Sequence, residues 1–215
     1  FHRLLYVAKL DDSQYRGDYE RELIQWIDNI VNTQAEDEIP QEEGNKLEYS
    51  GYAIVLGNMV VHMIEAEQIL MYRLVKTLRT EINTNGSHYK NAWVINYTED
   101  VVTRAYHNWY CKSVPHNSAT ANYKELKEDD RVSELYNAMI QIGKTGQDAA
   151  QKGETAVIAQ LKSQALEKIP AGDELQSVCS DSVMSLNEWM DFIFVTPDIC
   201  LEKEMQWPVD QDLIY

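Results

Sequence analysis

The stretch GNMVVHMIEAEQ, from Gly57 to Gln68, decides the fold of this 215-residue chain. After Asn58 it is apolar as far as Ile64, apart from one histidine, His62. In a β-strand successive side chains point to opposite faces, so His62 shares a face with Val60 and Ile64. A titratable ring between two aliphatic residues is a buried, hydrogen-bonded histidine, a metal or acid-base group, or a substitution in an older ligand site.

This run lies in a β-hairpin within an ordered series of elements. Residues 51–56 form one strand, Gly57-Asn58 a tight turn and residues 59–65 the other strand. The other predicted elements are a strand over 2–10, a helix over 17–32, a helix with an apolar stripe over 71–82, and strands over 92–98 and 108–114. The order β-α-β-β-α-β-β predicts an α+β, ferredoxin-like domain over residues 1–116, with two helices on one face of a four- or five-stranded sheet.

Residues 117–215 form a second region, predicted to be a linker, helices and an extended tail packed on the domain or on partners. Apolar stripes at helical spacing begin at Val132 and at Ile158, and Ser185 with Glu188 forms a capping-box pattern before a further helix. The widely spaced apolar anchors after that point favour an extended arm. The anchors that we expect to bind partners are Trp189, Phe192, Phe194, Trp207 and Tyr215.

The chain is strongly acidic, with 35 Asp and Glu against 19 Lys and Arg and a formal net charge of −16. This charge repels phosphate backbones and anionic lipids, so we expect neither nucleic acid nor membrane as a partner. Basic protein surfaces fit better, and an acidic inhibitor or nucleic-acid mimic stays open. Three cysteines without a CxxC pair, and no apolar run near the about 20 residues of a membrane span, predict a soluble cytoplasmic or cytoskeletal protein.

Two further features resemble chemical sites but are interpreted as structural. Glu65 and Glu67 stand at a strand-to-helix junction, where acids favour a helix N-terminus, so we expect solvated helix caps. Cys111 and Lys112 are neighbours on a strand and point to opposite faces, so the lysine is not placed to activate the thiol. Histidine spacing of the kind that binds metal is absent from the sequence, so no metal site is predicted.

Three short motifs in this order resemble the BLUF domain, the blue-light-using flavin module. RLLYVAK at 3–9 resembles its first strand, with Tyr6 where the family keeps a tyrosine beside the flavin. YSGYAIVLGNMVVHMIEA at 49–66 resembles its hairpin, and RAYHNWYCKSV resembles its last strand, with Trp109 at the family's tryptophan. The resemblance covers about residues 1–115 and implies the ferredoxin-like fold.

The chain departs from this family at the flavin-contacting positions. His62 stands where the family has the glutamine that switches hydrogen bonds, Glu48 lies near the family's asparagine, and Cys111 replaces a methionine. An imidazole cannot reproduce the donor and acceptor pair of an amide, and a carboxylate accepts but does not donate. The resemblance with these substitutions implies no bound cofactor, neither FAD nor FMN.

A second resemblance covers both the domain and the arm: the testis-expressed, BLUF-like family of animal sperm flagella. It rests on the VAK of the first strand, the hairpin histidine and the tail EWMDFIFVTPDICLEKEMQWP. It implies a non-catalytic structural or adaptor subunit of the ciliary or flagellar axoneme, associated with a radial spoke and bound to other axonemal proteins. The alternative is a flavin-binding blue-light sensory module that regulates a partner such as a cyclase.

Overall fold

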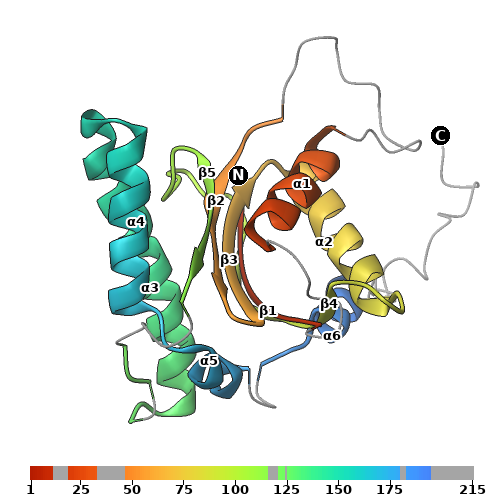
Figure 1. The fold of residues 1–215 in the computed structure, drawn as a ribbon. Coiled ribbons are helices and arrows are strands. Elements are labelled where there is room, and N and C mark those ends of the chain that lie inside the picture. The colour runs from red at the N-terminus through yellow and green to blue at the C-terminus, as the bar shows by residue number, and fades with distance from the viewer. Residues whose placement is uncertain (12–18, 33–46, 116–120, 124, 180–182, 195–215) are drawn as a thin grey trace, which may run out of the picture.

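The computed structural model describes residues 1–11, 19–32, 47–115, 121–123, 125–179 and 183–194, and in it a five-stranded sheet carries helices on both faces (Figure 1). The strands are β1 (His2–Leu10), β2 (Tyr49–Leu56), β3 (Met59–Ala66), β4 (Tyr89–Thr98) and β5 (Trp109–Val114). The helices are α1 (Tyr19–Asn32), α2 (Gln68–Asn83), α3 (Glu128–Ala149), α4 (Glu154–Lys168), α5 (Gly172–Val178) and α6 (Leu186–Phe194).

The strand order β4-β1-β3-β2-β5 confirms the predicted ferredoxin-like arrangement. The first four strands are antiparallel neighbours, and β5 is added at the edge, parallel to β2. The predicted turn of the hairpin is also present, because Gly57 has φ 62° between β2 and β3. Glycine is the residue that most readily adopts this left-handed conformation, which tight hairpin turns require.

Helices on both sides of the sheet divide the interior into two apolar layers. One layer lies under α1, α2 and α6 and contains Leu4, Ile64 and Leu74. The other lies under α3, α4 and α5 and contains Leu5 and Met63, the neighbours of Leu4 and Ile64 along their strands. Alternation along β1 and β3 therefore supplies both layers, which is why the sequence of β3 is apolar almost throughout.

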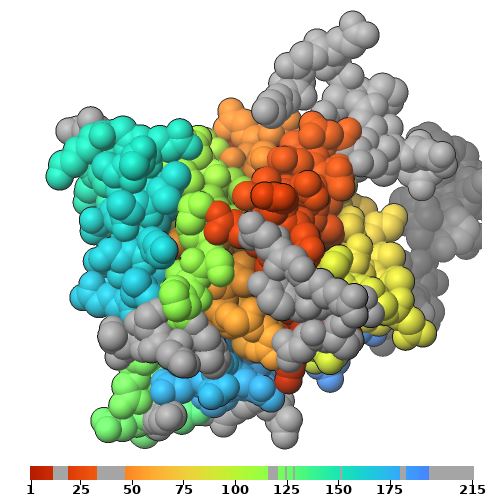
Figure 2. All heavy atoms as spheres, in the orientation of Figure 1, coloured from red at the N-terminus to blue at the C-terminus, as the bar shows by residue number. Residues whose placement is uncertain are grey.

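The C-terminal helices lie where the sequence left their position open. Figure 1 shows α3 and α4 on one face of the sheet and α1 and α2 on the other, and in Figure 2 the green β5 region lies between α4 (cyan) and α1 (red-orange). The predicted capping box is confirmed before α6, where the Ser185 amide donates to Glu188 Oε2 at 2.9 Å and the Glu188 amide donates to Ser185 Oγ at 3.3 Å. Within the described ranges no helix is long and apolar enough to cross a membrane.

Candidate functional site

A row of side chains crosses the sheet beneath α1 and α2. Register pairs Tyr6 of β1 with His62 of β3, His62 with Ala53 of β2, and Ala53 with Cys111 of β5. All four residues are buried. Tyr6, Ala53 and Cys111 belong to the apolar layer under α1 and α2, and His62 is the polar residue among them. The sheet thus brings three of the positions singled out from the sequence into one line.

His62 is held from both sides by hydrogen bonds to other side chains. Its Nδ1 lies 2.8 Å from the Tyr6 hydroxyl, and the Trp109 indole Nε1 donates to its Nε2 at 2.9 Å. The two aromatic rings meet the imidazole edge-on, with ring centroids 5.2 Å (Tyr6) and 5.9 Å (Trp109) from it. His62 is 0% exposed, so the alternation pattern correctly placed it on a core face.

The Trp109 bond fixes the tautomer of His62. An indole N–H donates and cannot accept, so Nε2 must carry a lone pair and the proton of the neutral ring lies on Nδ1. His62 therefore donates from Nδ1 to the Tyr6 oxygen. A protonated ring would have no acceptor for Trp109, so this arrangement requires the neutral form.

Burial also opposes protonation of His62, lowering its pKa from 6.5 to about 3. The unfolded chain binds this proton below about pH 6.5 whereas the folded chain does not, so stability is complete above that pH and is lost as the pH falls toward 3. Between pH 7 and pH 5 we expect His62 to remove about 2 kcal/mol from the free energy of unfolding. Urea titrations at the two pH values should show this loss in the natural chain.

The His62→Gln variant is the matched control for that measurement, because it removes the titrating ring while keeping a polar side chain of similar size. The carboxylates titrate in both proteins, so the difference between the two pH dependences isolates His62. Equal losses in the natural chain and the variant would contradict a neutral, buried imidazole.

Gly51 lies where the backbones of β2 and β3 approach closely. It pairs with Trp109 in the β2–β5 register, on the strand that separates β5 from β3. A Cβ built on Gly51 would lie 2.2 Å from the Met63 carbonyl oxygen, so the two backbones approach more closely than any side chain permits. A side chain at this position would therefore collide with the backbone of β3.

The other two positions of the resemblance have different surroundings. Cys111 is buried, 4% exposed, in the row described above. Glu48 lies just before β2 with a side chain 61% exposed, and its carboxylate pairs with Arg104 at 3.3 Å. Glu48 therefore lies at the surface rather than beside His62.

The expectation of a solvated cap is wrong for Glu65. Its side chain is 0% exposed, because β3 continues to Ala66 and alternation turns Glu65 toward the layer under α3. The Arg3 guanidinium pairs with Oε1 at 2.6 Å, and the amides of Ala105 and Tyr106 donate to Oε2 at 2.9 and 3.1 Å. Glu67, by contrast, is the half-exposed N-cap residue of α2.

Arg3 extends this buried network to α3. Its Nη1 donates to the Tyr136 hydroxyl at 3.1 Å and its Nη2 to the Thr103 carbonyl at 3.1 Å. The antiparallel register that aligns Tyr6 with His62 also aligns Arg3 with Glu65. The carboxylate thus joins β1, β3, the 103–106 segment and the C-terminal helices.

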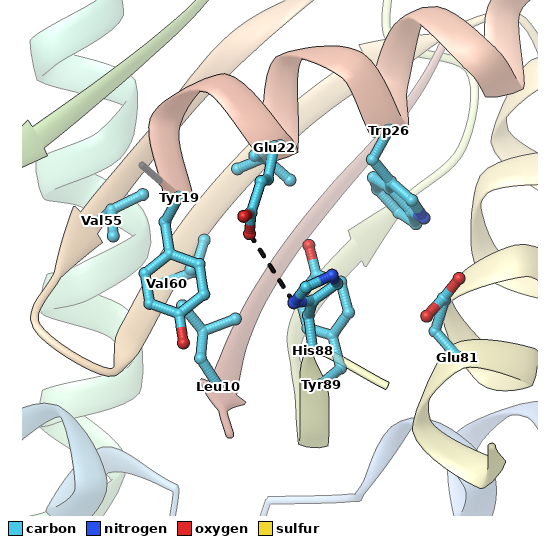
Figure 3. Close-up of a pocket in the computed structure, with 10 residues that line it drawn as sticks. Leu10, Tyr19, Glu22, Trp26, Val55, Val60, Glu81, His88 and Tyr89 are labelled. Carbon is cyan, nitrogen blue, oxygen red and sulfur yellow. Dashed lines mark ion pairs between the residues drawn. The ribbon is translucent and has the colours of Figure 1, made fainter. Parts of the chain in front are cut away.

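A small cavity lies at the other end of the α1–α2 face, between α1, the end of α2 and the start of β4 (Figure 3). Its volume is about 50 Å³, room for one or two waters, whereas ligand sites commonly span about 300–1,000 Å³. Figure 3 shows Glu22 facing His88 across its mouth, where the two side chains pair at 3.6 Å. The Trp26 indole nitrogen at its wall is buried without a hydrogen-bond partner among the described residues.

The described residues of this face do not fit a flavin. Both ring nitrogens of His62 are engaged by protein side chains, so neither is left to bind the carbonyl and N–H edge of a flavin ring. The layer between the sheet and α1 and α2 is filled by apolar side chains, and its cavity is far smaller than the ring system. Among the described residues, no three His, Cys, Asp or Glu side chains gather as a metal site.

The partner-binding candidates divide between described and undescribed residues. Trp189 of α6 is half-buried and packs edge-on against Tyr97, with ring centroids 5.1 Å apart. Phe192 is 69% exposed. The Phe194 side chain, Trp207 and Tyr215 lie outside the described part of the chain.

Fold and site together define an α+β ferredoxin-like protein with helices on both faces of the sheet and a Tyr-His-Trp group whose histidine is fully buried. The chain belongs to the testis-expressed protein 47 family, whose model matches residues 1–192. This match confirms the testis-expressed family to which the sequence was compared. Comparison with curated protein sequences found no significant relative.

Solved structures similar to the chain include a light-regulated cyclase, BlsA and BlrP1. A bacterial light-regulated adenylyl cyclase matches at 18% identity and a TM-score of 0.37, over 69% of this chain and 36% of the cyclase. The ground state of BlsA matches at 15% identity and a TM-score of 0.39, over 65% of this chain and 87% of BlsA. A calcium/cy-diGMP complex of BlrP1 from Klebsiella pneumoniae matches at 12% identity and a TM-score of 0.39, over 67% of this chain and 35% of BlrP1. The chain thus spans about a third of the cyclase and of BlrP1.

Proposed function

We propose that the chain is a non-catalytic structural or adaptor subunit of the ciliary or flagellar axoneme, attached at a radial spoke. The observation that carries this proposal is the closed His62 group. Tyr6 and Trp109 use both imidazole nitrogens, so the face that would receive a flavin serves as core. Membership of a testis-expressed family supports a role in sperm, and partners are expected to be other axonemal proteins.

Absorption spectroscopy tests the closed site. We expect the purified full chain, refolded or incubated with excess FAD or FMN and then desalted, to remain colourless and to show no light-induced spectral shift. The His62→Gln variant should also stay colourless, because restoring the amide neither removes the apolar filling nor moves Glu48 from the surface. A stoichiometric flavin whose blue absorption band shifts on illumination would overturn the closed site and favour the sensory alternative.

Localisation tests the axonemal assignment. Antibody labelling of sperm extracted with detergent should leave the protein on the demembranated axoneme, at the spacing of the radial spokes in high-resolution images. Extraction with the soluble fraction, or labelling confined to membranes or the head, would contradict it. This readout is independent of the spectrum, so each half of the proposal can fail separately.

A further inference from the structure

The free edge of the sheet at β4 forms the floor of a groove. β4 is the outermost strand on this side, with β1 as its neighbour on the other. The groove has a volume of about 550 Å³, within the size range of binding sites. One wall is α6, with Trp189 and Ile193, and the other is the first turns of α3, with Asp129 and Val132.

A short segment of the chain itself pairs with part of this edge. Ser185 forms an antiparallel bridge with Trp93, and the Val94 amide donates to the Met184 carbonyl at 3.0 Å. Beyond Val94, over Ile95–Thr98, no other described residue pairs with this edge of the backbone. Among the described residues, the edge is therefore used for strand pairing at Trp93 and Val94 and is unpaired over Ile95–Thr98.

The part of β4 that no described residue pairs with lacks charged and proline residues, which protect free edges. Natural sheets shield such edges with charged residues, proline or a covering element. Between Asn91 and Thr98 the sequence NAWVINYT holds no charged residue and no proline. Large apolar side chains are exposed on or beside the groove, with Met184 47%, Phe192 69% and Ile193 47% exposed. An uncovered strand with an apolar rim indicates a docking surface.

We infer that this groove binds an extended, basic segment of a partner protein, which adds to β4 as a further strand. Main-chain hydrogen bonds to Ile95–Thr98 would supply affinity, and alternate apolar side chains would pack against Trp189 and Ile193. Asp129 is the one charged side chain among the described residues that line the groove, so a Lys or Arg of the segment would pair with it. The inference rests on the proposed adaptor function and names the surface through which it acts.

Charge favours this occupant over the two that the chain itself could supply. A second copy brings a formal net charge of −16 to a groove whose lining charge is also negative. Residues 195–215, which follow α6, contain five acids and one lysine, a formal charge of −4. Like charges repel in both cases, whereas a basic segment is attracted and steered to the groove.

A random 12-residue peptide library displayed on phage, selected against the purified full chain, tests the inference. We expect the enriched peptides to alternate apolar residues and to carry Lys or Arg. Synthetic labelled versions should bind at least tenfold more weakly to Ile193→Glu and to Asp129→Lys, as measured by fluorescence anisotropy. Ile69→Glu is the matched control: Ile69 lies on α2, away from the groove, and is 46% exposed against 47% for Ile193, so binding should change less than twofold.

Hydrogen exchange then tests strand addition itself, because peptide binding should slow exchange of the amides in 95–98. The inference fails if no peptide is enriched, or if Ile193→Glu binds the peptides as well as the natural chain. It also fails if the free chain is a dimer that Ile193→Glu separates, or if the 95–98 amides are protected without peptide until residues 195–215 are removed. If Ile193→Glu still reaches the axoneme, the adaptor function stands and uses another surface.

Discussion

Replacing Glu65 with alanine should lower the free energy of unfolding by about 3–5 kcal/mol, as expected when one partner of a buried ion pair is removed. The variant leaves the Arg3 guanidinium without its carboxylate and the Ala105 and Tyr106 amides without their acceptor. All of these groups are buried or nearly so, so water cannot replace the lost bonds at low cost. Urea unfolding followed by circular dichroism measures the change.

Glu67→Ala is the matched control, because Glu67 is half-exposed and accepts one hydrogen bond, from the Glu48 amide at 3.0 Å. We expect it to cost about 1 kcal/mol or less. Glu65→Gln should fall between the two alanine variants, since it keeps one acceptor oxygen for the amides and loses the charge that pairs with Arg3. A Glu65→Ala variant as stable as Glu67→Ala would show that the carboxylate is not buried.

Gly51→Ala should destabilise the chain by about 3 kcal/mol or more, because crowding and backbone strain each contribute about 1–3 kcal/mol. The added Cβ would meet the Met63 carbonyl oxygen at 2.2 Å and Ile64 Cα at 3.0 Å, and both are backbone atoms of a central strand. Gly51 also has φ +151°, which side chains disfavour. A shift of β2 away from β3 would relieve this clash, but it would break the hydrogen bonds between the two strands.

Gly86→Ala separates the two causes. Gly86 has φ +82°, but a Cβ there would meet nothing within 4 Å, so strain acts without crowding. We expect a loss of about 1 kcal/mol. In Gly51→Ala the tryptophan emission should also change, because β2 lies between the strands of Trp109 and His62, whose side chains are hydrogen-bonded. Equal losses in the two alanine variants would indicate that the strands are not as close as the structure has them.

The elements of the ferredoxin-like part could be predicted because their signals are local. Apolar runs ended by polar turns gave the strands, and the period-two alternation of β3 placed His62 inward. The bounds differ by a few residues: β4 begins at Tyr89 rather than at residue 92, and β2 at Tyr49 rather than at 51. The extra residues of each strand are set by pairing with its neighbouring strand. This pairing depends on two strands together and cannot be read from one apolar run alone.

The partners of His62 and Glu65 could not be predicted, because they are set by contacts distant along the chain. Tyr6 and Trp109 lie 56 and 47 residues from His62, and the resemblance to the BLUF domain grouped the three positions without giving their hydrogen bonds. Glu65 resembled a helix cap because α2 begins three residues later. Its burial depends on the Ala105 and Tyr106 amides, 40 and 41 residues away, whose position no local pattern indicates.

The layer built from α3, α4 and α5 has a consequence for synthesis on the ribosome. The sheet is complete in sequence at Val114, but the last helix that covers its second face ends at Val178, 64 residues later. At about 5–20 residues per second, this interval lasts roughly 3–13 seconds. During that time Leu5 and Met63 and their neighbours, which end in the second apolar layer, have no cover. The growing chain is therefore expected to need a chaperone that shields apolar strands until translation reaches the helices.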